Sequence, residues 1–329
     1  MIRLTLLFTL VAALTGITDA FSAPATSLAF NPDGSVIASA SGQHVTLLSA
    51  ATGDESGSFT FDGERALTVA FQPGGSLLAV GTGIPGEKGG VYMVNWLMGK
   101  RAGPLATNAD AVTCVAFSPD GKLLAVASAD KSAHIFRIET YGAKLVPVFA
   151  LTGHSAAVQA IAYSPDGQTL VTASVDRSLK VWSAADGKLI RSFGQHTDAV
   201  QALAFRPVVQ DRPDAPPYCA SGGDDRTVRV WQPTVGRMVR IVRRHDGPVL
   251  ALAFTPDGRS LFSASKEGII RRIDADSDEV LGEFRGSTDW IYALAISPDG
   301  RMLVSGDWAG KVQRWSIGEK EINSIPAGN

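Results

Sequence analysis

The chain has 329 residues, of which 45% are hydrophobic and 19% are charged, and its formal net charge is −2. This composition supports a large packed core and excludes an intrinsically disordered chain. Because the net charge is near zero, the chain lacks the positive field that gathers nucleic acid, so no nucleic-acid partner is expected.

The first twenty residues differ from the rest of the chain. Arg3 is a lone positive charge ahead of the uncharged segment Leu4–Ile17, and small residues, Thr18 and Ala20, then stand where a signal peptidase reads. The apolar segment is short for a membrane span. We therefore expect residues 1–20 to be a signal peptide and the mature chain, without a membrane span, to be periplasmic or secreted. The alternative is an uncleaved cytosolic chain.

One motif recurs seven times: an apolar strand, then Pro, and in most copies Asp-Gly, as in Val115–Gly121 (VAFSPDG). Pro presets φ for a turn and Gly supplies a positive φ, so each copy predicts a strand followed by a tight turn. The copies are separated by 41 to 49 residues, as their prolines show: Pro32, Pro73, Pro119, Pro165, Pro207, Pro256 and Pro298.

The fourth copy contains four strand patterns, Val158–Tyr163, Thr169–Ser174, Ser178–Trp182 and Lys188–Phe193. A four-stranded antiparallel sheet cannot bury both of its faces alone, whereas radial stacking buries them against neighbouring sheets. The sequence thus predicts an all-β, seven-bladed β-propeller with four-stranded blades. It forms one domain over residues 21–329, and its blades begin near residues 25, 66, 112, 158, 200, 249 and 291.

The repeats resemble those of the WD-repeat (Trp-Asp repeat) family over about residues 25–325. In that family a His, a hydroxyl, an Asp and a Trp form a hydrogen-bonded chain within a blade. A buried indole, imidazole and carboxylate must satisfy one another, so the resemblance implies a structural rather than catalytic role. The matching residues are His154, Thr172, Asp176 and Trp182 in the fourth copy and His196, Ser221, Asp225 and Trp231 in the fifth.

The other copies depart from this pattern, and no Trp in the chain is followed by Asp. We expect their blades to depend more on apolar packing, and blades four and five to be the most rigid. The residues standing at motif positions are Leu48 in the first copy, Val94 in the second, Asn108 and Phe136 in the third, Glu267 and Ile273 in the sixth, and Ser287 and Ala309 in the seventh.

Residues that interrupt the repeat are the candidates for function. Trp290, Tyr292 and Trp308 of the seventh copy are expected on the face that holds the turns between second and third strands. Large aromatic side chains in turns are typical of interaction sites. The alternative is that they fill the seam where the ring closes.

A second candidate is the glycine-rich segment Gly81–Gly90, predicted as an enlarged mobile turn with Glu87 and Lys88 at its tip. It lacks the Gly-Lys-Ser/Thr of a phosphate-binding loop, so a contact with a partner is the better interpretation. A basic series is interpreted as a charged sheet edge that blocks pairing: Arg237, Arg240, Arg243, Arg244, Arg271 and Arg272.

No catalytic motif, metal-ligand spacing or cofactor motif occurs, and Cys114 and Cys219 are expected to be unpaired. The resemblance to the WD-repeat family implies a non-enzymatic scaffold that binds protein partners through the propeller faces. With the predicted signal peptide, we expect this scaffold to be exported, and we expect it to be a monomer. The alternative function is a small-molecule or enzymatic site at the mouth of the channel. Ring closure is predicted without strand exchange, with Lys320–Ile325 as the outer strand of blade seven.

Overall fold

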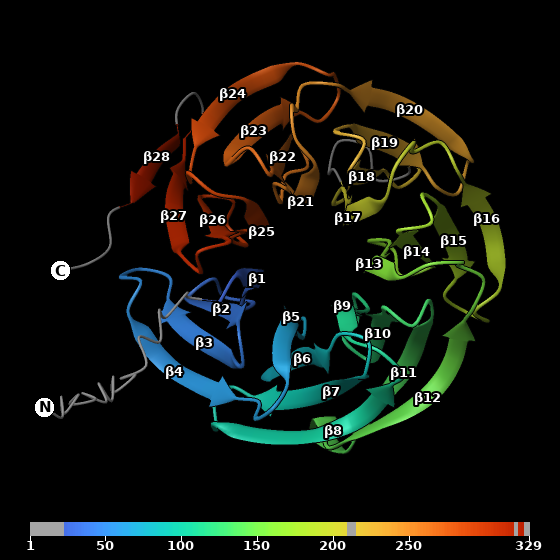
Figure 1. The fold of residues 1–329 in the computed structure, drawn as a ribbon, viewed down its shortest axis with the longest axis vertical. Helices are drawn as coiled ribbons and strands as arrows, with labels where there is room; N and C mark the ends of the chain where they lie inside the picture. Colours follow the sequence, from blue (N-terminus) through green and yellow to red (C-terminus); the bar gives the residue numbers. More distant parts are fainter. Residues whose placement is uncertain (1–22, 209–214, 319–321, 326–329) are drawn as a thin grey trace, which may run out of the picture.

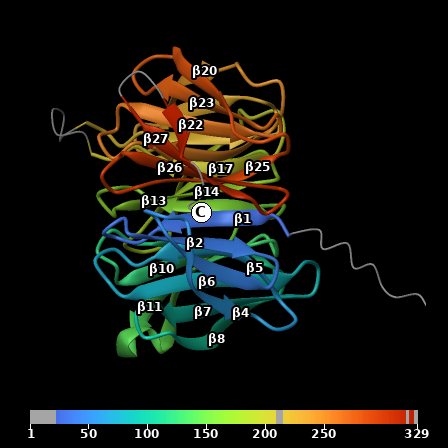
Figure 2. The same ribbon diagram turned by 90° about the vertical axis from the view of Figure 1, so that its left-hand side faces the viewer.

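The computed structural model of the chain describes residues 23–208, 215–318 and 322–325. Seven four-stranded antiparallel sheets form a ring, and each is ordered in sequence from the innermost to the outermost strand (Figure 1). The edge-on view in Figure 2 shows the blades stacked around the ring. The prediction of an all-β, seven-bladed propeller is confirmed.

The first four blades consist of the following elements. They are β1 (Ala25–Phe30), β2 (Val36–Ser41), β3 (His44–Ser49), β4 (Glu55–Thr60); β5 (Arg65–Phe71), β6 (Leu77–Ile84), β7 (Lys88–Asn95), β8 (Lys100–Asn108); β9 (Val112–Phe117), β10 (Leu123–Ser128), β11 (Ala133–Glu139), the short 3₁₀ helix η1 (Thr140–Gly142), β12 (Lys144–Leu151); and β13 (Val158–Tyr163), β14 (Thr169–Ser174), β15 (Leu179–Ser183), β16 (Leu189–Phe193).

The remaining three blades follow the same plan. Their strands are β17 (Val200–Phe205), β18 (Cys219–Gly223), β19 (Val228–Gln232), β20 (Arg237–Val242); β21 (Val249–Phe254), β22 (Ser260–Ser265), β23 (Ile269–Asp274), β24 (Val280–Arg285); and β25 (Ile291–Ile296), β26 (Met302–Asp307), β27 (Val312–Ile317), β28 (Ile322–Ile325).

In blades one, three, four, six and seven, a Pro-Asp-Gly turn joins the inner strand to the second strand on what we call the bottom face. In blade three, Asp120 accepts hydrogen bonds from the Ser118 hydroxyl (2.6 Å) and the Lys122 backbone N–H (3.1 Å), and Gly121 has a φ of 69°. The Asp120 carboxylate thus stabilises the turn, and Gly121 adopts the positive φ that the turn requires without steric strain. The opposite face carries the turns between second and third strands, and we call it the top face.

The core consists of apolar clusters between adjacent blades. At every joint except the one between blades seven and one, the cluster contains seven to ten buried side chains. The cluster between blades seven and one contains five: Leu28, Ile37, Ala50, Ala293 and Val304. Since burial of apolar surface is the main stabilising contribution, this seam is the least stabilised apolar joint among those the structure describes.

The seam closes without an exchanged strand among the described residues. β28 pairs antiparallel with β27, through Arg314↔Ile325 to Ile317↔Ile322, so blade seven takes all four strands from the C-terminal part of the chain. Across the seam, Arg314 on β27 donates hydrogen bonds to the carbonyl oxygens of Ala50 (3.1 Å) and Ala51 (2.7 Å) of blade one. Side-chain contacts therefore hold the ring together at this joint.

The prediction of an enlarged turn at Gly81–Gly90 is wrong. β6 and β7 remain paired as far as Ile84↔Lys88, which leaves only three residues in the turn. The glycines allow this long hairpin to pack against the start of blade three. A Cβ atom on Gly89 would lie 2.3 Å from the Asp110 carbonyl oxygen, and one on Gly83 would lie 2.5 Å from the Ala111 Cα. The glycines thus serve close packing here.

The two cysteines are free thiols, Cys114 on β9 and Cys219 on β18. Blade four separates their blades, whereas a disulfide requires Cα atoms within about 7 Å. Burial raises the pKa of both thiols, which disfavours the reactive thiolate. We expect two titratable thiols in the denatured, unreduced protein. A thiol count of zero in the same assay would contradict this assignment.

Candidate functional site

The predicted polar residues of blade four form a continuous hydrogen-bonded chain. The Trp182 indole N–H donates to the Thr172 hydroxyl (2.9 Å), Thr172 lies 2.7 Å from His154 Nε2, and His154 Nδ1 lies 2.9 Å from Asp176 Oδ2. Burial opposes ionisation of Asp176, but hydrogen bonds from Ser178, Ser155 and His154 hold its pKa well below the usual range. Burial lowers the pKa of His154.

Blade five repeats the arrangement and adds a buried cation. Trp231 Nε1 donates to Ser221 Oγ (2.7 Å), Ser221 lies 2.7 Å from His196 Nε2, and His196 Nδ1 lies 2.8 Å from Asp225 Oδ2. Arg229 Nη2 donates to the same Asp225 oxygen at 3.1 Å. The structure therefore brings together all eight residues of the two predicted networks, and it places them inside the blades.

Blade six replaces the motif Asp and Trp with an ion-pair network. His245 Nε2 lies 2.8 Å from Ser263 Oγ, and Arg271 Nη1 lies 2.7 Å from His245 Nδ1. Arg271 also forms ion pairs with Glu267 (3.1 Å) and Glu283 (2.8 Å). The interpretation of Arg271 as part of a solvated edge is wrong, because its side chain is buried in this network.

The same network makes blade six sensitive to acid. Burial, aided by the Arg271 charge, lowers the pKa of His245 from 6.5 to about 4. The His245 imidazole thus takes up a proton more readily in the unfolded chain than in the folded protein. Its stabilising contribution is fully present above pH 6.5 and is lost as the pH falls through that value toward 4.

We expect acidification from about pH 7 to about pH 4 to lower the free energy of unfolding by about 3 kcal/mol through His245 alone. Urea denaturation across this range measures the loss. His245→Gln removes the titrating ring, so the variant should lose correspondingly less stability. An equal loss in both proteins would contradict the assignment.

Blades two and seven contain polar contacts that the repeat pattern did not indicate. In blade two, Glu64 accepts a hydrogen bond from Thr82 (2.5 Å) and forms an ion pair with Lys88 (3.1 Å). Lys88 is therefore tied to its own blade, while Glu87 is exposed in the turn beside it. In blade seven, the Ser287 hydroxyl donates to Asp307 (2.7 Å). Asp307 precedes the motif position at Ala309, which is why spacing alone missed it.

The three predicted aromatic residues of blade seven form one cluster on the top face. The ring centroids of Trp290 and Trp308 lie 5.6 Å apart, those of Tyr292 and Trp308 5.7 Å apart, and those of Trp290 and Tyr292 6.2 Å apart. A hydrogen bond from the Trp308 backbone N–H to the Trp290 carbonyl (2.9 Å) fixes the turn beside the inner strand. The Lys266 ammonium lies over the Trp290 ring, 4.2 Å from its centroid. Glu87 and Lys88 lie on blade two, outside this cluster.

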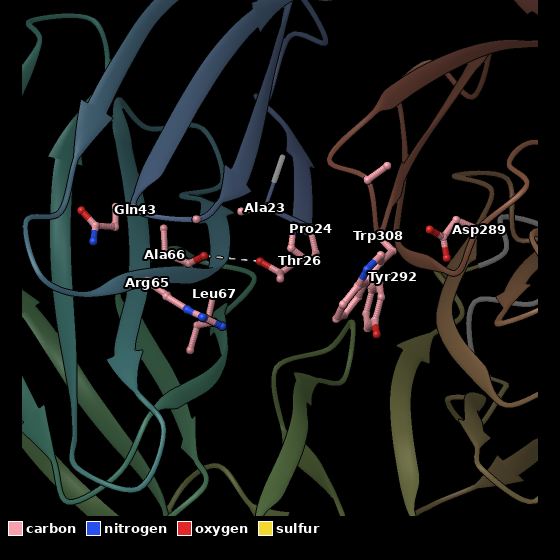
Figure 3. A pocket seen from close by; sticks show the side chains of 12 residues that line it. Ala23, Pro24, Thr26, Gln43, Arg65, Ala66, Leu67, Asp289, Tyr292 and Trp308 are labelled. Carbon is pink, nitrogen blue, oxygen red and sulfur yellow. Dashed lines mark hydrogen bonds between the residues drawn. The ribbon is translucent and has the colours of Figure 1, made fainter. Parts of the chain in front are cut away.

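Two members of the aromatic cluster, Tyr292 and Trp308, line a pocket of about 1170 Å³ on the top face. Tyr292 and Trp308 stand side by side on one side of it, and Gln43, Arg65 and Leu67 lie on the other (Figure 3). A separate cavity of about 310 Å³ is lined by the inner strands of all seven blades, and Tyr292 contributes to both spaces. The cluster thus stands at the mouth of the central channel.

In the part of the chain that the structure describes, no three His, Cys, Asp or Glu side chains come together as a metal site. Likewise, no helix in residues 23–208, 215–318 and 322–325 has the length and apolar character that crossing a membrane requires.

Comparison with known families agrees with this architecture. No curated protein matches the chain significantly. The WD40 family (WD domain, G-beta repeat) matches six segments, which together cover more than half of the chain: residues 11–47, 100–137, 145–183, 187–232, 236–274 and 278–316. Propellers of this family commonly serve as protein-interaction scaffolds. With seven blades, two complete His–hydroxyl–Asp–Trp networks and six matched repeats, the chain belongs to the WD40 family.

Proposed function

We propose that the protein is an exported, monomeric, non-enzymatic scaffold that binds protein partners through the top face of its propeller. The observation that carries this proposal is the contiguous cluster of Trp290, Tyr292 and Trp308 at the channel mouth. Aromatic side chains supply much contact area for little loss of conformational entropy, and Trp and Tyr dominate the energetics of protein interfaces.

The exposure of these rings favours binding over a purely structural role. Trp290 is 39% exposed and Trp308 is 47% exposed, although both are large apolar side chains. Aromatic residues that only filled the seam would be buried, and the seam is already packed by Leu28, Val304 and their neighbours. Exposed apolar surface of this kind is typical of an interaction site.

The polar networks support a non-enzymatic role. The His154 and His196 side chains are 1% and 0% exposed, and each ring is hydrogen-bonded through both nitrogen atoms inside its blade. A general base must reach a substrate proton, which these enclosed rings do not. A small-molecule site is the second candidate, favoured by the apolar and aromatic lining that Leu67, Tyr292 and Trp308 give the pocket.

The export part of the proposal depends on residues 1–20, which lie outside the described residues. Mass spectrometry of the mature protein from its native host tests it. We expect the chain to begin at Phe21, after cleavage at Ala20. A mature chain that begins at Met1 would contradict export by this route.

Quantitative affinity capture from the native compartment tests partner binding. The wild type is compared with Trp290→Ala/Trp308→Ala and with a control, Met98→Ala, which removes an exposed apolar side chain from the bottom face. We expect partner proteins recovered with the wild type and the control to be lost with the double variant. Equal recovery by all three proteins would contradict a top-face aromatic site.

A further inference from the structure

The pocket beside the aromatic cluster has two chemically different walls. Figure 3 shows the rings of Tyr292 and Trp308 together on one side, and Arg65 and Leu67 from the start of β5 opposite them. Its volume of about 1170 Å³ exceeds the roughly 300–1,000 Å³ typical of small-molecule sites. A pocket of this size at an open channel mouth suits a segment of polypeptide.

Arg65 brings an uncompensated positive charge to this pocket. Its side chain is exposed, and among the described residues no carboxylate lies within ion-pair distance of its guanidinium. The neighbouring acid, Glu64, is already occupied by Lys88 and Thr82. Arg65 therefore has five N–H groups in a planar fork available to a ligand, and a carboxylate fits that fork with two parallel hydrogen bonds.

The other free polar groups of the pocket can each donate a hydrogen bond. Among the described residues, the Trp308 indole N–H, the Tyr292 hydroxyl and the Gln43 amide have no hydrogen-bond partner. The one lining carboxylate, Asp289, accepts a hydrogen bond from the Trp290 backbone N–H (2.8 Å). In Figure 3 Asp289 lies beyond Tyr292 and Trp308 as seen from Arg65, so its charge does not face the guanidinium across the pocket.

From this arrangement we infer that the pocket binds an acidic peptide segment of a partner protein. A carboxylate of the segment pairs with Arg65, and an adjacent apolar side chain packs on Tyr292 and Trp308. The inference rests on the proposed function and names the chemistry of the partner. Opposite charge supplies specificity and the aromatic wall supplies apolar contact area.

A random dodecapeptide library displayed on phage, selected against the full chain, tests the inference. We expect enriched peptides to carry Asp or Glu next to an apolar residue. For the strongest synthetic peptide, replacing its Asp or Glu with the corresponding amide should weaken binding by about tenfold or more. Raising NaCl from about 50 to about 500 mM should also weaken binding, because the charged pair is solvent-accessible.

Variants of the chain locate the contact. Arg65→Glu should weaken the peptide by at least about tenfold, whereas Arg226→Glu, the same charge change in an exposed top-face turn of blade five, should leave affinity within about twofold. Trp308→Ala should also weaken binding. Melting curves of each variant establish that it is folded.

The outcomes separate this inference from the function on which it rests. Peptides that depend on Trp308 but not on their carboxylate or Arg65 would overturn the acidic specificity and leave the aromatic interaction site standing. Enrichment of basic peptides would do the same. Failure to enrich any peptide would overturn the inference. Binding that changes with neither Arg65→Glu nor Trp308→Ala would also overturn it and would count against the top-face site as well.

Discussion

Asp225→Ala is expected to lower the free energy of unfolding by about 3 kcal/mol or more, because it removes the acceptor from a buried charged network. The Asp225 side chain is 2% exposed and accepts hydrogen bonds from Arg229 and Thr227 while also contacting His196. Its removal leaves the Arg229 guanidinium, which is 7% exposed, without its carboxylate partner. A buried cation that has lost its counterion is strongly destabilising.

The matched control is Asp120→Ala in the bottom-face turn of blade three. Asp120 also accepts two hydrogen bonds, but its side chain is 56% exposed, so water can replace them. The expected cost is about 1 kcal/mol or less. Urea denaturation of both variants measures the difference. Equal midpoints would show that the blade-five network does not stabilise the fold as its geometry indicates.

Arg314→Ala is expected to loosen the ring at the joint between blades seven and one. Arg314 is 6% exposed and bridges to the Ala50 and Ala51 carbonyl oxygens, where the apolar cluster is smallest. Its loss removes hydrogen bonds from two carbonyl groups and leaves a cavity in the joint, which together should cost about 3 kcal/mol. Arg314→Lys keeps the positive charge but loses the planar guanidinium that can bridge two carbonyl oxygens, so its free energy of unfolding should lie between those of the wild type and Arg314→Ala.

Hydrogen exchange shows where the loss occurs. We expect amide exchange in β1–β4 and β25–β28 to accelerate in Arg314→Ala, while β13–β20 change little. Arg191→Ala is the control, because Arg191 also bridges two blades, to the Thr234 carbonyl, but is exposed. Uniform acceleration in all seven blades, or none in blades one and seven, would contradict a seam held by Arg314.

The sequence predicted those parts of the structure that are encoded locally. The Pro-Asp-Gly turns set the register of the five blades that contain them, since the Asp carboxylate and the Gly φ are properties of four consecutive residues. The two His–hydroxyl–Asp–Trp networks are likewise contained within single blades, so motif spacing was sufficient to place them.

Contacts between distant segments were not predictable in this way. Arg314 and the Ala50 carbonyl that it contacts are 264 residues apart in the chain, and a cation on a third strand has the same local pattern whether it is exposed or buried. Arg271 is also a cation on a third strand, and this local pattern does not show its burial, although its partners Glu267 and Glu283 lie in the same blade. The glycines of β6 and β7 have the local pattern of a turn, because their packing partners, Asp110 and Ala111, belong to the next blade.

The candidate site was only half predictable. Strand alternation and turn position placed Trp290, Tyr292 and Trp308 on the top face. Arg65 gave no sequence signal, because an Arg at the start of a strand is commonly a solvated charge. Its significance depends on its position across a pocket from Tyr292 and Trp308, which the ring closure of blades seven, one and two creates.

The central claim is that the top-face aromatic cluster binds a protein partner, and site-specific photo-crosslinking in the native host tests it most directly. A photoreactive phenylalanine derivative replaces Ala309, an exposed residue beside Trp308 in the pocket lining, or, as a control, Met98 on the bottom face. We predict a crosslinked protein adduct of defined mass from position 309 that is absent from position 98. No adduct from position 309, or the same adducts from both positions, would contradict the claim.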